Sequence, residues 1–266
     1  MSRPLISKQN SWFNFEKITL EVFTLALKKL HQKSRLPIVE DDLRKNSLNR
    51  TLSYCLLEAI NDWEKINDTD IPTTPKSNLG KQLNLDLPED FNDYERTKPD
   101  FQWEFRDRLG SQNSLNSIFK NYDIECKRVG NDISSSRNLS KEYVYKGVSR
   151  FIQRTHCYGQ YTDSGLMIGY VQDAELQVIL SEVNKALKSA SLPEILLSSM
   201  GWEVDISRLD HRLERLDIDT NQFNLTHLWV DLRHHYTKSH SPQTDEIEKR
   251  SKKKEASSPR NVSTKL

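Results

Sequence analysis

The stretch Lys98-Pro99-Asp100-Phe101-Gln102-Trp103-Glu104-Phe105 alternates apolar and polar residues, and so does Tyr122-Asp123-Ile124-Glu125-Cys126-Lys127-Arg128-Val129. Alternation with a period of two predicts that both stretches are β-strands. Asp100 lies on the polar face of the first strand. On the second strand Glu125 and Lys127 share a face, while Cys126 points away. If the two strands pair, two carboxylates and one ammonium group meet at one place.

Two carboxylates at the end of a strand suit a hard divalent cation. Mg²⁺ is commonly held by one or two carboxylates, and water and substrate phosphate oxygens fill its other positions. Such a metal polarises a phosphoryl group and neutralises the leaving oxygen. A lysine on the same face orients the attacking water or stabilises the charge that develops on phosphorus.

The order Pro99-Asp100, a gap, and then Glu125-Cys126-Lys127 resembles the motif of the PD-(D/E)XK nuclease superfamily, which has the restriction-endonuclease-like fold. The resemblance implies that Asp100 and Glu125 bind Mg²⁺ or Mn²⁺, together with the carbonyl of Cys126. It makes Lys127 the catalytic lysine. Many members also have an acidic residue on the helix before the core strands. Glu40 is the favoured candidate for that metal-binding role, and Glu58 is the other.

A basic segment follows these strands. The residues 141–156 are predicted to form a helix on which Lys146, Arg150 and Arg154 recur every four positions and form one stripe. We expect this stripe to contact nucleic-acid phosphates, and a solvated helix face is the alternative. Some superfamily members carry Gln-x-x-x-Tyr here, but in this chain Cys157 stands where that Tyr would.

The remaining patterns predict an α/β protein. Amphipathic helices are expected at 12–32 and 40–65, a long connection with one short strand at 66–97, a buried strand at 165–171, a helix at 173–189 and a final strand at 223–232. Residues 192–216 are left open between a further strand and a charged turn. The resemblance implies an α-β-β-β-α-β core with a mixed central sheet and added N- and C-terminal helices. The expected parts are an N-terminal helical extension (1–36), the nuclease-like domain (37–236) and a disordered basic tail (237–266).

Composition and motifs argue against several classes of protein. The chain has 39 basic and 38 acidic residues, so nucleic-acid binding must come from a local basic patch. Its three cysteines are odd in number and lack metal-type spacing, which argues against a zinc site or a disulfide framework. It has no membrane-length apolar run, no signal-peptide pattern and no phosphate-binding loop of the kind that hydrolyses ATP. We expect a cytoplasmic protein.

The resemblance implies a Mg²⁺-dependent endonuclease that cleaves DNA, in the setting of bacterial restriction or antiviral defence. A homo-oligomer is expected, as is a partner protein that supplies target recognition or ATPase activity. Two alternatives remain open. One is a non-catalytic DNA-binding or assembly subunit on the same fold. The other is a protein-interaction module, in which Asp100 and Glu125 would not cluster.

Overall fold

The computed structural model divides the chain into two units, Met1–Tyr236 and Thr237–Leu266, and every described residue lies in the first. The described residues are 8–34, 36, 45–71, 73–77, 98–106, 119–132, 134, 137–153, 155–156, 158–216, 218 and 221–235. Two expected site residues, Glu40 and Arg154, and the expected tail 237–266 lie outside this set.

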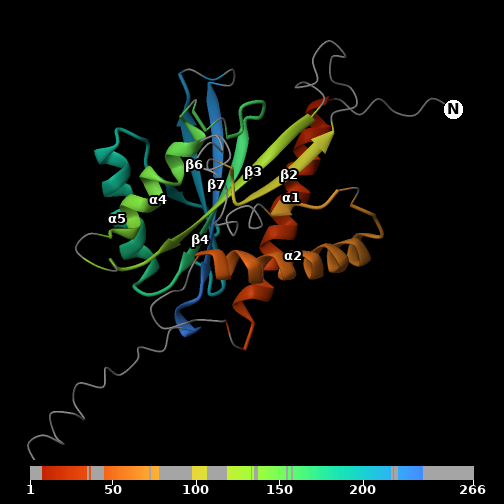
Figure 1. Cartoon of the computed structure of the whole chain (residues 1–266), viewed down its shortest axis with the longest axis horizontal. Helices are drawn as coiled ribbons and strands as arrows, with labels where there is room; N and C mark the ends of the chain where they lie inside the picture. The colour runs from red at the N-terminus through yellow and green to blue at the C-terminus, as the bar shows by residue number, and fades with distance from the viewer. Residues whose placement is uncertain are drawn as a thin grey trace, which may run out of the picture. The chain divides into compact units, whose positions relative to one another are not determined.

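The described strands form one mixed sheet in an α/β protein (Figure 1). The strands are β1 (Lys76–Ser77), β2 (Phe101–Arg106), β3 (Phe119–Val129), β4 (Ser164–Val171), β5 (Leu196–Leu197), β6 (Ile206–Glu214) and β7 (Gln222–Asp231). Their order across the sheet is β1-β2-β3-β4-β7-β6-β5. The central strands β3, β4 and β7 are parallel to one another, and the strands on either side pair antiparallel.

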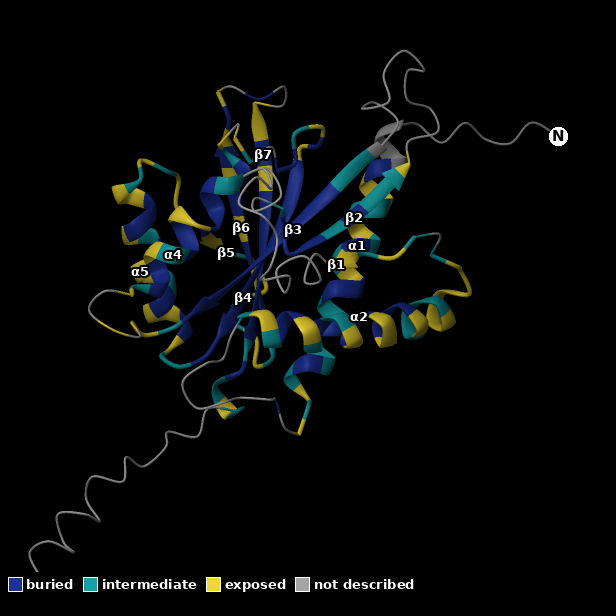
Figure 2. Cartoon of the chain, in the orientation of Figure 1, coloured by how far each residue is buried: buried dark blue, intermediate teal, exposed yellow. Residues whose placement is uncertain are grey.

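Helices cover both faces of the sheet. In Figure 1, α1 (Lys8–His31) and α2 (Lys45–Asn67) lie on one side, and α4 (Leu139–Tyr145) and α5 (Leu176–Ser189) lie on the other. Each face has its own apolar core, one with α1 and α2 and one with α4, α5 and the short 3-10 helix η3 (Val148–Phe151). Every residue of β4 is buried, as expected for a parallel strand covered on both faces (Figure 2).

Strand β3 separates its side chains between the two faces as its alternation predicts. Tyr122, Ile124 and Cys126 pack in the core with α1 and α2. The intervening residues therefore face the other side, and Glu125 and Lys127 are among them. The carboxylates of Asp123 and Glu125 and the ammonium group of Lys127 therefore lie on the face opposite α1 and α2.

The predicted helix at 141–156 is wrong in its extent. Helix α4 begins after Asn138, whose side chain accepts a hydrogen bond from the amide of Lys141 at 2.7 Å, and it ends at Tyr145. The chain then turns at Gly147, where a Cβ atom would lie only 2.3 Å from the carbonyl oxygen of Tyr143. Only a glycine permits that approach, and a glycine also weakens the helix. Lys146 and Arg150, which were expected on one helical stripe, therefore do not share a helix, and Arg154 lies outside the described residues.

The other elements agree with the sequence patterns to within a few residues. This holds for α1, α5, β2, β3, β4 and β7, and for α2 as far as it is described. The open region 192–216 contains β5 and β6. Within the described part of the chain, no helix is both long and apolar enough to cross a membrane.

Candidate active site

The pairing of β2 with β3 brings the two motif carboxylates together. Phe101 lies opposite Ile124, so Asp100, one residue before the strand, lies beside Glu125. The amide N–H of Cys126 donates a hydrogen bond of 2.8 Å to Asp100 Oδ2. Asp100 is 7% exposed and Glu125 is fully buried. Register and a main-chain donor thus fix both groups on one side of the sheet, as the sequence predicts.

Lys127 completes the predicted motif. Its side chain lies on the same face as Glu125, and its ammonium group pairs with Glu125 Oε1. Lys127 is 8% exposed. Its Cγ lies close to Gly147, where a Cβ atom would be 3.3 Å away. The turn that ends helix α4 therefore leaves the space in which this lysine is packed.

Two further cations reach the same carboxylates from other elements. Lys45, at the start of α2, places its Nζ 2.7 Å from Asp100 Oδ2 and 3.3 Å from Glu125 Oε1. The two oxygens are therefore no more than 6.0 Å apart. Arg150, in η3, donates from Nη1 to Glu125 Oε2 at 3.0 Å. We call these five residues, Asp100, Glu125, Lys45, Lys127 and Arg150, the ion cluster.

Burial and the neighbouring charges shift the pKa values of residues in the ion cluster. Burial alone would raise the pKa of Glu125, but Lys127, Lys45 and Arg150 outweigh it and lower that pKa to about 2. Burial and the neighbouring Glu125 raise the pKa of Asp100 to about 6, against the effect of Lys45. Burial lowers the pKa of Lys127. Near neutral pH both carboxylates are mainly ionised, which is the form that binds a cation.

The two carboxylates fit a hard divalent cation that takes most of its ligands from water and substrate. No group of three or more His, Cys, Asp or Glu side chains that could hold a metal occurs among the described residues. Two carboxylates that already share one cation, the ammonium of Lys45, nevertheless match the usual protein contribution to Mg²⁺. The main chain of Cys126 borders the same place through its amide, and its side chain points to the opposite face.

Tyr158 also belongs to this site. Its hydroxyl accepts a hydrogen bond of 3.2 Å from Arg150 Nη1 and donates one of 3.5 Å to Glu125 Oε2. The sequence reasoning did not single out Tyr158, because the Gln-x-x-x-Tyr spacing was not met in this chain.

Buried polar contacts hold the turn that carries Tyr158. Asp123 Oδ2 accepts the amide N–H of Gly159 at 2.7 Å, and Asp123 Oδ1 accepts from Gln102 Nε2 at 2.8 Å. Arg215 is fully buried and donates to the carbonyls of Tyr158 at 3.3 Å and Gly159 at 3.1 Å. The turn is thus fastened to β3 on one side and to the end of β6 on the other.

The remaining predicted site residues lie apart from the ion cluster. Lys146 has a side chain that is 68% exposed and pairs with Glu142 at 3.3 Å. Glu58 pairs with Lys33 at 3.6 Å. It lies 13 residues after Lys45 on α2, which is about 20 Å along the helix axis. The described structure therefore does not bring Glu58 to the carboxylates.

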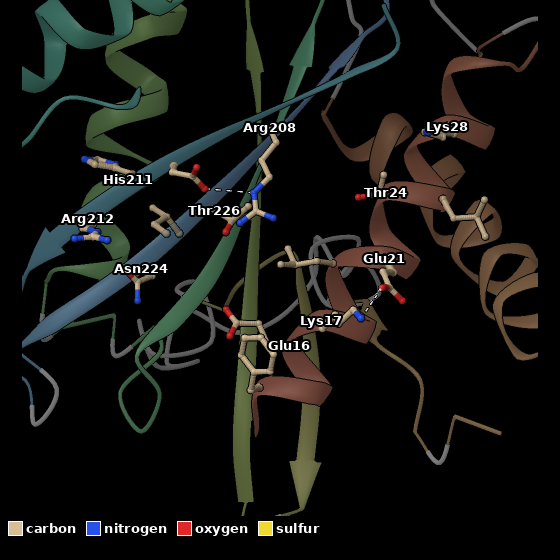
Figure 3. A pocket seen from close by; sticks show the side chains of 15 residues that line it. Glu16, Lys17, Glu21, Thr24, Lys28, Arg208, His211, Arg212, Asn224 and Thr226 are labelled. Atoms are coloured by element: carbon tan, nitrogen blue, oxygen red, sulfur yellow. Dashed lines mark hydrogen bonds and ion pairs between the residues drawn. The ribbon is translucent and has the colours of Figure 1, made fainter. Parts of the chain in front are cut away.

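A groove of about 890 Å³ lies elsewhere, between α1 and strands β6 and β7 (Figure 3). Asp100, Glu125 and Lys127 are not among the described residues that line it. Its charges are mixed and partly paired, as in Lys17 with Glu21 at 3.8 Å and Arg208 with Asp210 at 3.3 Å. The groove therefore lacks the uniform positive charge that attracts a nucleic acid.

No family model, no curated protein and no solved structure matches this chain. The function of this chain is therefore inferred from the chemistry of the ion cluster and from the elements that build it.

Proposed function

We propose that this protein is a Mg²⁺-dependent phosphodiesterase that cleaves DNA. The observation that carries the proposal is the convergence of Asp100, Glu125 and Lys127 on one buried point of the sheet. These residue types are the ones that metal-assisted phosphodiester hydrolysis needs. The order of α2, β1, β2, β3, α4 and β4 also supports a restriction-endonuclease-like core, because it reads α-β-β-β-α-β.

Each residue has a role that follows from its position. Asp100 and Glu125 would hold the metal, with the carbonyl of Cys126 and Glu40 as the further ligands that the resemblance implies. The bound metal would polarise the phosphoryl group and assist the leaving oxygen. Lys127 keeps its ammonium group at the carboxylates, where it can orient a water molecule or stabilise negative charge on phosphorus. Arg150 adds a second fixed donor beside Glu125.

The clustering weighs against the protein-interaction alternative, which predicted that Asp100 and Glu125 would lie apart. Burying two carboxylates is unfavourable unless they are paired or bind a cation. An interaction module would have no evident reason to maintain such a group inside its sheet. One observation favours the non-catalytic DNA-binding or assembly subunit, because the ammonium of Lys45 already neutralises the carboxylates.

The DNA contacts and biological setting are further parts of the proposal. Lys146 is exposed and could exchange its ion pair with Glu142 for a phosphate, and Arg154 stays a prediction. Arg150 points to Glu125, so a phosphate contact from it would be made at the reaction centre itself. Restriction or antiviral defence, a homo-oligomer, and a partner that supplies target recognition or ATPase activity fit this chemistry. They come from the resemblance alone.

A cleavage assay tests the proposal. Supercoiled plasmid, linear duplex and single-stranded DNA are incubated with the full chain and Mg²⁺ or Mn²⁺. Asp100→Asn and Lys127→Met should each lower the cleavage rate at least about 100-fold. Glu104→Gln is the matched control, since this carboxylate lies four residues further along, on the same face of the chain as Asp100, but pairs with Lys76 at 3.7 Å. It should cleave like the wild type.

Cleavage by Asp100→Asn or Lys127→Met at the wild-type rate would refute the assigned roles. If the wild type cleaves none of the three substrates but shifts DNA in a gel, the non-catalytic subunit becomes the better reading.

A further inference from the structure

We propose that Lys45 is a built-in competitor of the divalent cation and sets the metal affinity of the site. Its ammonium group pairs with both Asp100 and Glu125, and a metal binds only by displacing it. This inference rests on the proposed metal-dependent function, which it deepens by naming how metal binding is controlled.

The contacts single out Lys45 among the three cations. Lys127 and Arg150 pair with Glu125, whereas Lys45 pairs with both carboxylates, at 2.7 Å and 3.3 Å. A metal bound by those same two carboxylate oxygens would need the position that the ammonium group of Lys45 occupies. Two cations cannot share it at contact distance, because their repulsion is strong in a poorly solvated site.

Lys45 is also the cation that can leave. Its side chain is 24% exposed, against 10% for Lys127. Its charge is carried on a flexible four-carbon stem. Lys127 lies inside a central strand and is packed against the Gly147 turn. Displacement therefore moves one partly exposed side chain toward solvent and leaves the sheet and the catalytic lysine in place.

The contacts of Lys45 show what holds its ammonium group in place. It pairs with both carboxylates of the sheet, Asp100 and Glu125. Once a metal neutralises those carboxylates, Lys45 loses its attraction to the site. The two cations thus exclude each other, and each binds where the other has left.

Direct Mn²⁺ binding to the full chain, measured by calorimetry or electron paramagnetic resonance without DNA, tests the inference. Lys45→Met removes the charge and keeps most of the length of the side chain, and it should bind Mn²⁺ at least about tenfold more tightly than the wild type. Lys29→Met is the matched control, because Lys29 is also 24% exposed and pairs with Asp62 at 2.6 Å on another surface. It should bind like the wild type.

A second variant guards against loss of folding, which circular dichroism would detect. Lys45→Gln also removes the charge but keeps hydrogen-bond donors for Asp100, and it should bind Mn²⁺ more tightly as well. Lys45→Arg keeps a cation and should stay near the wild-type affinity.

The outcomes separate this inference from the proposed function. Equal or weaker Mn²⁺ binding by folded Lys45→Met and Lys45→Gln, with binding by the wild type, would overturn the role of Lys45 alone. No binding by any variant would overturn both. Tighter binding by the Lys45 variants without any DNA cleavage would support the role of Lys45 and overturn the phosphodiesterase.

Discussion

A buried chain of hydrogen bonds makes the stability of this protein sensitive to acid. His211 Nε2 lies 2.9 Å from the carbonyl oxygen of Pro193, which can only accept, so this nitrogen carries the proton. His211 Nδ1 must then accept from His227 Nε2 at 3.4 Å. His227 Nδ1 in turn accepts from the hydroxyl of Tyr143 at 2.7 Å, and that oxygen accepts from Trp229 Nε1 at 3.0 Å. Each N–H and O–H group in this chain of hydrogen bonds has an acceptor only if both histidines are neutral.

The size of the effect follows from the histidine pKa values. Burial lowers the pKa of His211 from 6.5 to about 4 and lowers that of His227 well below its usual value. Between the ordinary histidine pKa of the unfolded state and the lower pKa of the folded state, the folded state binds fewer protons. The free energy of unfolding therefore falls as the pH falls through this range. Each such group removes about 1.4 kcal/mol per pH unit within its window. His211 alone should therefore remove roughly 3 kcal/mol between pH 6.5 and pH 4.

Urea unfolding at a series of pH values compares the wild type with His211→Leu. At pH 7 the variant should be less stable by about 1–3 kcal/mol, because the buried N–H of His227 loses its acceptor. Below pH 6.5 the wild type should lose stability faster than the variant, and the gap should close by about 1.4 kcal/mol per pH unit. Parallel curves from pH 7 to pH 4.5 would refute the assignment of neutral, tautomer-fixed histidines.

Two further predictions concern packing and the turn that carries Tyr158. Gly169→Ala would place a Cβ atom 2.4 Å from Cδ1 of Trp229. This overpacking should lower the free energy of unfolding by about 1–3 kcal/mol. An unchanged urea midpoint would contradict the prediction. Arg215→Met removes the donors to the carbonyls of Tyr158 and Gly159. It should destabilise the protein by roughly 2–4 kcal/mol and speed limited proteolysis within 152–163, whereas wild-type cleavage at that turn would show that Arg215 does not hold it.

The sequence was sufficient to predict the carboxylate half of the site because that half depends on strand alternation. A period of two fixes which residues of β3 share a face, and the pairing register then places Asp100 beside Glu125. The pattern of β6 was also present in the sequence. Arg208, Asp210 and Arg212 are exposed, with buried residues between them, so a count of alternating charges would have predicted this strand.

Lys127 follows from the same alternation, but the positions of the other two cations, Arg150 and Lys45, could not be predicted in this way. The helical spacing of Lys146 and Arg150 assumed a continuous helix, but Gly147 ends it. After that turn Arg150 lies in η3 and points inward to Glu125, while Lys146 stays on the surface. Lys45 lies far from the motif in sequence and reaches it only because α2 packs beside β3. No local pattern reports that kind of tertiary proximity.

This difference has a consequence for how the site would work. The carboxylates belong to a sheet whose register and buried main-chain donor leave them little freedom. The cations come from three separate elements and differ in exposure, with Lys45 and Arg150 more accessible than Lys127. The carboxylates are therefore the rigid part of the site. The cations that neutralise them are the part that can change position. Under the proposed function, metal binding would depend less on the carboxylates than on which of the protein's own cations can be displaced.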